Sequence, residues 1–134
     1  MSCDKCKAPT VHLKKMEIFR PPPVLVIQLK RFRQVGLMWR KVQTSVDFPL
    51  KNLDFSQHVT DLNYLVKSGI ETKYNLHGVV SHFGTLTFGH YISFVQNQFD
   101  QRWYMYDDGK VSVISEQQLN KESAYILFYV RKDI

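Results

Sequence analysis

The stretch FGHYISFVQNQFDQRWYMYDDGKV, residues 88–111, contains two alternating, aromatic-rich runs on either side of a polar turn. This pattern predicts an antiparallel hairpin with a four-residue loop. If Gln96 and Gln101 close the loop, His90 falls directly opposite Asp107. Cross-strand partners bring their Cβ atoms to within about 5.5 Å, so the carboxylate would hold one imidazole nitrogen and leave the other free for chemistry. The stretch therefore predicts a general base with its orienting acid.

The same pair also has a purely structural interpretation, as a cross-strand polar contact on a solvated face. Its surroundings favour catalysis. Gly89 lacks a side chain and would let a backbone or a substrate approach closely. Aromatic side chains are expected to exclude water around the pair, namely Phe88, Tyr91, Trp103, Tyr104 and Tyr106. Because strand side chains alternate, one of Asp107 and Asp108 is expected to face the histidine and the other the opposite side.

The chain has 134 residues, of which 44% are hydrophobic and 13% aromatic, enough for the core of one domain. No apolar run approaches the roughly 20 residues of a membrane span, and no secretory segment opens the sequence. The two cysteines, Cys3 and Cys6, are too few for a disulfide framework and fit a reducing compartment. We therefore expect a soluble protein that is not exported, with no membrane partner.

The net charge of +6 raises the question of a nucleic-acid partner. The lysines and arginines are scattered in clusters of two or three, and no nucleic-acid-binding motif is present. A solvated basic surface explains the charge, so we expect no nucleic acid as partner. A basic, zinc-dependent nucleic-acid binder is kept only as a remote alternative.

Hydrophobic periodicity predicts several further strands. The β-branched run Val24 to Gln28 is expected to be a buried central strand that runs on to Phe32. The other expected elements are strands over residues 10–19, 39–48, 74–82, 110–114 and 124–130, short helical turns within residues 49–69 and 115–119, and a glycine-bounded loop over residues 83–89 that opens or closes over a site. The predicted fold class is α+β, a mainly antiparallel, twisted sheet with a few short helices.

The pair Cys3-x-x-Cys6 has the spacing of half a tetrahedral zinc site. A structural zinc ion needs four ligands, and the chain holds no second CxxC or CxxH. Adding His12 as a third ligand still leaves the site open. A closed zinc site is expected only if another segment supplies the missing pair.

A series of motifs follows in order along the chain: Cys3-x-x-Cys6, PVLVIQLKRF (residues 23–32), Phe48-Pro49, YNLHGVVSHFG (74–84), GHY (89–91), WYMYDD (103–108) and AYILFY (124–129). Each is weak alone, but their order and spacing resemble the catalytic domain of the ubiquitin-specific protease family. The resemblance covers essentially the whole chain.

The resemblance implies a papain-like thiol protease with thumb, palm and fingers, which hydrolyses the bond after the C-terminal glycine of ubiquitin. Residues 1–20 would belong to the fingers and residues 21–134 mainly to the palm. By motif, His90 is the catalytic base, Asp107 the orienting acid and Asp108 a secondary candidate, in line with the hairpin argument. Three further matches, Phe32, His82 and Tyr91, line the channel for the ubiquitin tail, and residues 33–38 and 83–89 form mobile loops that bracket it.

The departures from the family pattern concern the nucleophile and the zinc. The Gly-Asn-Thr-Cys type of box that carries the family's nucleophile is absent, and Cys3 and Cys6 match zinc-ligand positions. We therefore expect the C-terminal part of a catalytic domain, inactive alone. It would need no cofactor for catalysis, and it would hold structural zinc only with the upstream ligand pair.

The expected partners are ubiquitin and ubiquitin-conjugated proteins, inside the cell in cytoplasm or nucleus. Self-association of the fragment through uncovered palm surface is also expected. The alternative is a non-catalytic ubiquitin-binding or scaffolding module with a vestigial site.

Overall fold

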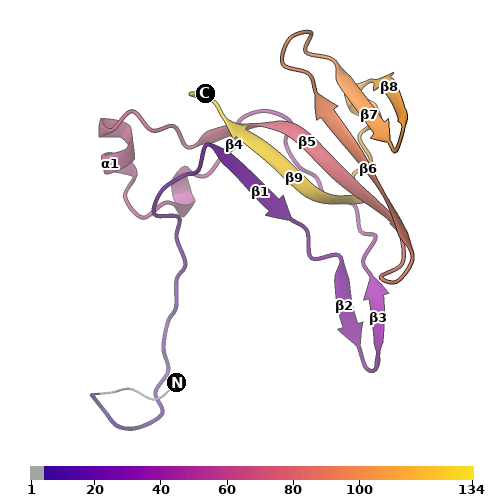
Figure 1. Ribbon diagram of the computed structural model, residues 1–134. Helices are drawn as coiled ribbons and strands as arrows, with labels where there is room; N and C mark the ends of the chain where they lie inside the picture. The colour runs from indigo at the N-terminus through magenta and orange to yellow at the C-terminus, as the bar shows by residue number, and fades with distance from the viewer. Residues whose placement is uncertain (1–4) are drawn as a thin grey trace.

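The computed structural model describes residues 5–134, and within them seven strands form one antiparallel sheet (Figure 1). Their order is β1-β9-β5-β6-β7-β8, with the short β4 pairing beside β5. The strands are β1 (Val24–Gln28), β4 (Leu53–Asp54), β5 (Lys73–Gly84), β6 (Gly89–Gln96), β7 (Trp103–Asp107), β8 (Lys110–Ile114) and β9 (Ala124–Arg131). Since β5, β6, β7 and β8 follow each other as hairpins, the predicted site stretch lies inside a continuous meander.

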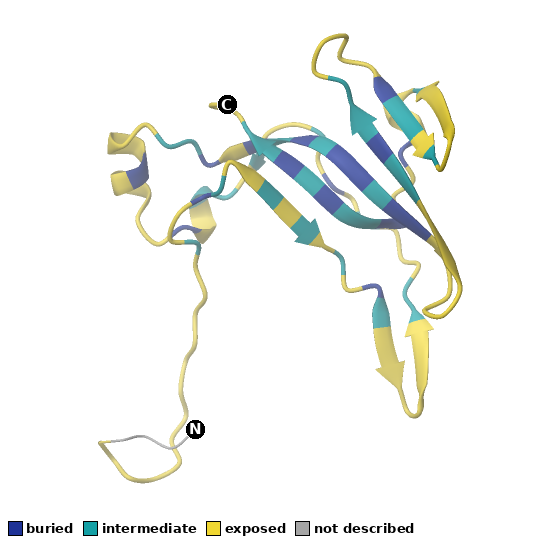
Figure 2. Ribbon diagram, viewed as in Figure 1, coloured by how far each residue is buried: buried dark blue, intermediate teal, exposed yellow. Residues whose placement is uncertain are grey.

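The core lies on one face of the long strands, where buried and less buried residues alternate along β5 and β9 (Figure 2). This alternation is the pattern of a sheet that is packed on one side. The buried apolar residues are Phe48, Tyr74, Leu76, Val79, Phe94, Trp103, Leu119, Ala124, Leu127 and Tyr129. Burial raises the pKa of Tyr129 to about 12, and its hydroxyl donates to the carbonyl of Pro49 at 2.8 Å, so the coil after residue 48 is fastened over the core.

A separate hairpin of β2 (Phe32–Val35) and β3 (Met38–Lys41) projects from the sheet, and we call it the arm (Figure 1). Its base is anchored by Arg31, which is buried and donates only to backbone carbonyls. The acceptors are Ala124 O at 2.7 Å, Thr44 O at 2.5 Å, Lys121 O at 2.9 Å and Val42 O at 3.2 Å. Because a buried guanidinium is costly unless its donors are satisfied, these bonds fix where the arm begins.

Among residues 5–134, three short helical segments lie outside the sheet, as predicted for residues 49–69 and 115–119. They are η1 (Ser56–His58), α1 (Leu62–Lys67) and η2 (Glu116–Gln118). Asp61 caps α1 by accepting from the Tyr64 N–H at 2.9 Å. No helix in the described part of the chain is long and apolar enough to cross a membrane.

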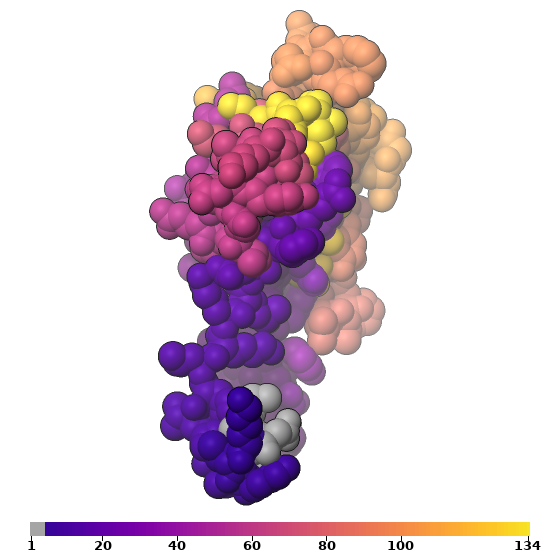
Figure 3. Space-filling view, turned by 90° about the vertical axis from the view of Figure 1, so that its left-hand side faces the viewer, coloured from indigo at the N-terminus to yellow at the C-terminus, as the bar shows by residue number. Residues whose placement is uncertain are grey.

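Three strand predictions were wrong or too long. Residues 10–19 form no strand: the segment stands out from the body (Figure 3), and only Ile18 makes a bridge, to Val59. Of residues 39–48, only those up to Lys41 pair in a strand. In the coil that follows, the carbonyls of Val42 and Thr44 accept hydrogen bonds from Arg31 instead. β1 is an edge strand rather than a central one and ends at Gln28. The mainly antiparallel sheet with few short helices is confirmed.

Candidate active site

The hairpin that carries the predicted site is present, but its register differs from the expected one. Gln96 pairs with Trp103, not with Gln101, and the Asn97 N–H donates to the Arg102 carbonyl at 2.9 Å. The four-residue loop therefore begins one position later. The loop polar groups explain the shift, because the Asp100 carboxylate accepts from the Arg102 N–H at 3.0 Å and so turns the chain after the position where closure was expected.

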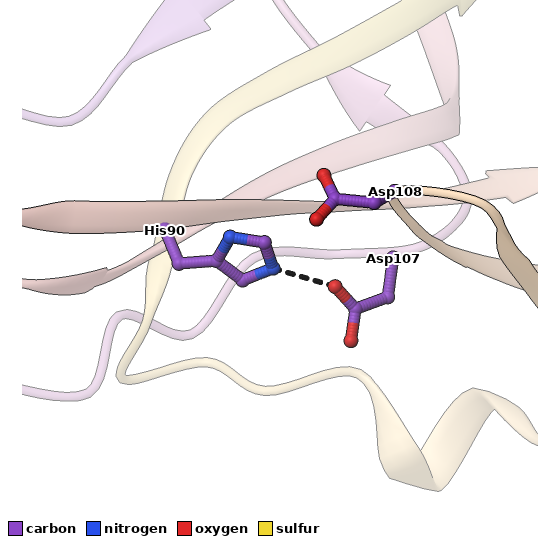
Figure 4. A group of neighbouring side chains, drawn as sticks. All are labelled: His90, Asp107 and Asp108. Carbon is purple, nitrogen blue, oxygen red and sulfur yellow. Dashed lines mark hydrogen bonds and ion pairs between the residues drawn. The ribbon is translucent and has the colours of Figure 1, made fainter.

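His90 and Asp107 nevertheless meet, as diagonal rather than directly opposite neighbours. The distance from His90 Nε2 to Asp107 Oδ1 is 2.5 Å (Figure 4). His90 is the second residue of β6, and Asp107 is the last residue of β7. In the register set by the Ser93–Tyr106 pair, the side chains of His90 and Asp107 lie on the same face of the sheet. Diagonal neighbours lie within reach of a long side chain, so the predicted pair forms despite the different register.

Asp108 lies beside the pair, contrary to the expectation that it faces the other side. It occupies the turn between β7 and β8 with φ at 50°, in the left-handed region. This turn ends the strand alternation and brings its carboxylate back, so that ligand atoms of His90, Asp107 and Asp108 lie within 4.8 Å of one another (Figure 4). Two carboxylates therefore face one imidazole.

These carboxylates raise the pKa of His90 above 6.5. The hydrogen bond that His90 donates to Asp107 is the largest cause; desolvation comes second and acts in the other direction, and the charges of Asp107 and Asp108 add to the rise. The pair is open to solvent, with 47% of the His90 and 35% of the Asp107 side chain exposed. The expected aromatic shield was wrong: Phe88 is itself exposed, and Trp103 is buried at the other end of β7.

The arrangement suits proton transfer at the other ring nitrogen. With Nε2 held by Asp107, Nδ1 is the atom that can exchange a proton with a nucleophile. A raised pKa also favours the imidazolium, and an imidazolium stabilises an adjacent thiolate. In Figure 1 the N-terminal segment, which carries Cys6, lies on the other side of the molecule from β6 and β7. The geometry fits a base and its orienting acid.

The three predicted channel residues lie together in one group, and one of them, Tyr91, directly follows His90 in β6. The His82 ring lies 5.4 Å from the Phe32 ring and 4.7 Å from the Tyr91 ring, measured between centroids. Tyr125, which the sequence reasoning missed, completes the group at 6.0 Å from both Phe32 and His82. We call these four residues the aromatic cluster. Tyr125 lies in the AYILFY stretch at the start of β9, but nothing in its strand pattern separates it from core residues.

Gly89 is required beneath this cluster. A Cβ built on it would overlap His82 Nε2 and approach the Phe83 carbonyl at 2.9 Å. His82 is buried, and its pKa is lowered, first by desolvation and then by the charge of Lys41. The expected close approach at Gly89 is therefore real, but its partner is the ring of His82.

The glycine-bounded loop is shorter than expected. Strands β5 and β6 pair as far as Gly84 and Gly89, which leaves only residues 85–88 as the loop. The Thr85 N–H donates to the Phe88 carbonyl at 2.7 Å and closes it. Leu86 and Phe88 at its tip are exposed.

Only one cysteine of the predicted half zinc site lies among the described residues. Cys3 lies outside the described residues, and Cys6 is exposed. Among residues 5–134, the one group of three or more His, Cys, Asp or Glu side chains with converging ligand atoms is His90, Asp107 and Asp108.

Known proteins with similar sequences are ubiquitin carboxyl-terminal hydrolases. Residues 1–129 match the family model described as ubiquitin carboxyl-terminal hydrolase. Human ubiquitin carboxyl-terminal hydrolase 15 is 41% identical over 131 residues, which are 98% of this chain and 13% of that protein. Ubiquitin carboxyl-terminal hydrolase 8 of Arabidopsis thaliana is 39% identical over 130 residues, 96% of this chain and 14% of that protein. The chain thus spans only a small part of these relatives.

Solved structures agree with the sequence matches. The SAGA Ubp8/Sgf11/Sus1/Sgf73 DUB module bound to ubiquitin aldehyde is similar with a TM-score of 0.81 and 33% identity, over 98% of this chain and 29% of that one. The Ubp8 module bound to monoubiquitin gives the same TM-score and identity, over 98% of this chain and 28% of that one.

Proposed function

Because the chain belongs to the ubiquitin carboxyl-terminal hydrolase family, we propose that it supplies the base and acid of a deubiquitinating thiol protease. The observation that carries this proposal is the 2.5 Å bond between His90 Nε2 and Asp107 Oδ1, which leaves Nδ1 for a thiol. The nucleophilic cysteine comes from a part of the protein outside this sequence.

In the proposed reaction, the thiol proton moves to His90 Nδ1 while the Nε2–H donates to Asp107. The thiolate attacks the carbonyl carbon of the last ubiquitin residue. His90 then gives its proton to the leaving amine, the C–N bond breaks, and a thioester remains. Water, deprotonated by His90, hydrolyses the thioester and restores the thiol. Asp107 keeps the ring in one tautomer and orientation throughout, and Asp108 adds negative charge beside the imidazolium.

The aromatic cluster is proposed to line the channel for the ubiquitin tail. Its support is position: Tyr91 directly follows His90 in β6, and Phe32, His82 and Tyr125 surround Tyr91 within one small region. The substrates would be ubiquitin-conjugated proteins, which places the activity inside the cell, in cytoplasm or nucleus.

We also propose where the chain lies within the family's catalytic domain and how it would bind zinc. Residues 1–20 would belong to the fingers and residues 21–134 mainly to the palm, supported by the extended course of residues 5–17 and the sheet that begins at Val24. Cys3 and Cys6 would share a structural zinc ion with a second pair from another segment. Catalysis itself would need no cofactor.

The test is hydrolysis of a fluorogenic ubiquitin C-terminal substrate. The full-length protein should turn the substrate over, and His90→Ala should abolish turnover. The chain of 134 residues alone should be inactive. Turnover by this chain alone that is lost on His90→Ala would refute the assignment of the nucleophile to another segment.

A second candidate is a non-catalytic ubiquitin-binding module with a vestigial site. It is favoured by the aromatic cluster, since a tail channel can bind ubiquitin without a nucleophile. In that case the full-length protein would bind ubiquitin in calorimetry but leave the fluorogenic substrate intact. A full-length sequence without a cysteine box would support the same outcome.

A further inference from the structure

Two residues of the arm, Phe32 and Lys41, contact the same residue of the sheet, His82. Phe32 and Lys41 are cross-strand partners at the base of the arm and therefore share one face. The Phe32 ring packs edge-on against the His82 ring at 5.4 Å, and Lys41 Nζ donates to the His82 carbonyl at 2.5 Å. Phe32 thus contacts the side chain of His82, and Lys41 binds its backbone carbonyl.

The His82 carbonyl is available for this bond because of how the sheet ends. Strand β9 begins at Ala124, so its ladder with β5 stops at Ser81. Beyond that point the His82 N–H donates to the Ser123 carbonyl at 2.9 Å, and the His82 carbonyl accepts from Lys41 instead of from a strand. The Lys41 ammonium therefore replaces a ladder hydrogen bond with a charge-assisted one.

Holding an ammonium at this place is costly. Desolvation lowers the pKa of Lys41, and the charge of the nearby Arg31 lowers it further. Within residues 5–134, no carboxylate lies within ion-pair distance of Lys41 to offset that cost. The hydrogen bond to His82 is what keeps this ammonium in position.

We propose that Lys41 is a positioning residue, which latches the arm onto His82 and so sets the width of the aromatic cluster. On the far side of His82, Tyr91 is its cross-strand partner and the neighbour of His90. Phe32 stands on the near side, carried by the arm. If the latch opens, Phe32 moves away from His82 and Tyr91, while β6 and β7 with their His90–Asp107 bond stay in place.

The proposal rests on the proposed function for its kinetic consequence, which is a separation of KM from kcat. In the full-length protein, Lys41→Met removes the donor and keeps the length of the side chain. We expect KM for the fluorogenic ubiquitin substrate to rise about tenfold, as for loss of one charge-assisted hydrogen bond. kcat should stay within about twofold, because Lys41 does not touch the catalytic pair. Lys41→Arg, which keeps a donor, should bring KM most of the way back to that of the unaltered protein.

Arg40→Met is the matched control. Arg40 is the next residue in β3, pairs with Arg33 on the opposite face of the arm and is exposed. Arg40→Met removes the same charge as Lys41→Met without altering a contact to His82, so the KM of this variant should stay close to that of the unaltered protein. An equal rise in KM for Arg40→Met and Lys41→Met would show that charge alone attracts the substrate, and would overturn the latch. So would an unchanged KM for Lys41→Met, or a fall in kcat alone.

Hydrogen exchange gives a readout that does not depend on activity. In the full-length protein, Lys41→Met should speed amide exchange in peptides covering residues 32–41 and leave those covering residues 89–107 unchanged. Equal protection of the arm in both proteins would refute the latch even if the protein proved not to be a hydrolase. Faster exchange in an inactive protein would keep the latch and reject only the proposed function.

Discussion

His82 and His90 lie on the two strands of one hairpin, yet their surroundings are opposite. His82 is buried among aromatic rings, and burial lowers its pKa. His90 is open to solvent beside two carboxylates, and they raise its pKa. The neutral form of His82 suits a rigid channel wall, and the readily charged form of His90 suits proton transfer. The same side chain thus has its pKa shifted in opposite directions, and its neighbours decide which way.

The largest effect that tests this contrast is loss of the base itself. His90→Gln in the full-length protein should lower kcat by about a hundredfold to ten-thousandfold, because it removes proton transfer. His82→Gln should act mainly on KM, since that ring does not reach the catalytic pair. The measurement is steady-state hydrolysis of the fluorogenic ubiquitin substrate. A larger fall in kcat for His82→Gln would reverse the two assignments.

The two aspartates should differ in the same assay. Asp107→Ala removes the hydrogen bond that orients the ring and should lower kcat strongly, whereas Asp108→Ala removes only a neighbouring charge and should lower it less. Asp107→Asn should retain part of the activity, because an amide oxygen can still accept the Nε2–H. The reverse order of Asp107→Ala and Asp108→Ala would contradict the geometry in Figure 4.

A substitution at Gly89 tests the packing around His82. Gly89→Ala would place a methyl group against His82 Nε2 and should destabilise the fold by about 1–3 kcal/mol, as for an overpacked core. Gly109→Ala is the matched control, since nothing lies within 4 Å of a Cβ at that position. Chemical denaturation of both variants measures the difference. Equal stability of the two variants would mean that His82 can move away from Gly89 at little cost.

The smallest effect is on the titration of the two rings, followed by NMR. The midpoint of His90 should lie above 6.5 and that of His82 below it. Asp107→Asn should bring the His90 midpoint down and leave that of His82 where it is. Because the folded-state pKa of His90 is raised, its contribution to stability is fully present below pH 6.5 and is lost as the pH rises through the folded-state value. His82 has the opposite sign: its lowered pKa costs stability as the pH falls below 6.5.

The sequence correctly predicted that His90 and Asp107 meet, and it predicted the register of the hairpin incorrectly; the strand period explains both outcomes. The period of a strand is two, so a shift of two residues keeps every side chain on its face. Asp107 therefore stayed on the side of His90 although its direct partner changed. Asp108 was misplaced because the left-handed turn that carries it ends the alternation on which the prediction relied.

The long-range contacts could not be predicted from the pattern. Arg31 lies in an apparently continuous strand, but its guanidinium collects carbonyls from far along the chain. Lys41 looks like any exposed basic residue until the end of β9 leaves the His82 carbonyl unpaired. Strand β8, in contrast, was predicted over its observed residues, since its alternation is local and its turn is the short Asp108-Gly109 link.

The position of the site within the sheet also has a consequence for local unfolding. The order of the strands places β1 and β8 at the two ends of the described sheet, and β6 and β7 each have a neighbour on both sides. Fraying begins at sheet ends, where a strand loses one set of hydrogen bonds rather than two. The strands that carry His90 and Asp107 should therefore stay paired during the small, frequent openings that expose β1. The pairing of β6 with β7 runs only from Ser93–Tyr106 to Gln96–Trp103, so His90 and Asp107 lie just beyond the end of this ladder and their backbone should open more readily than the ladder does.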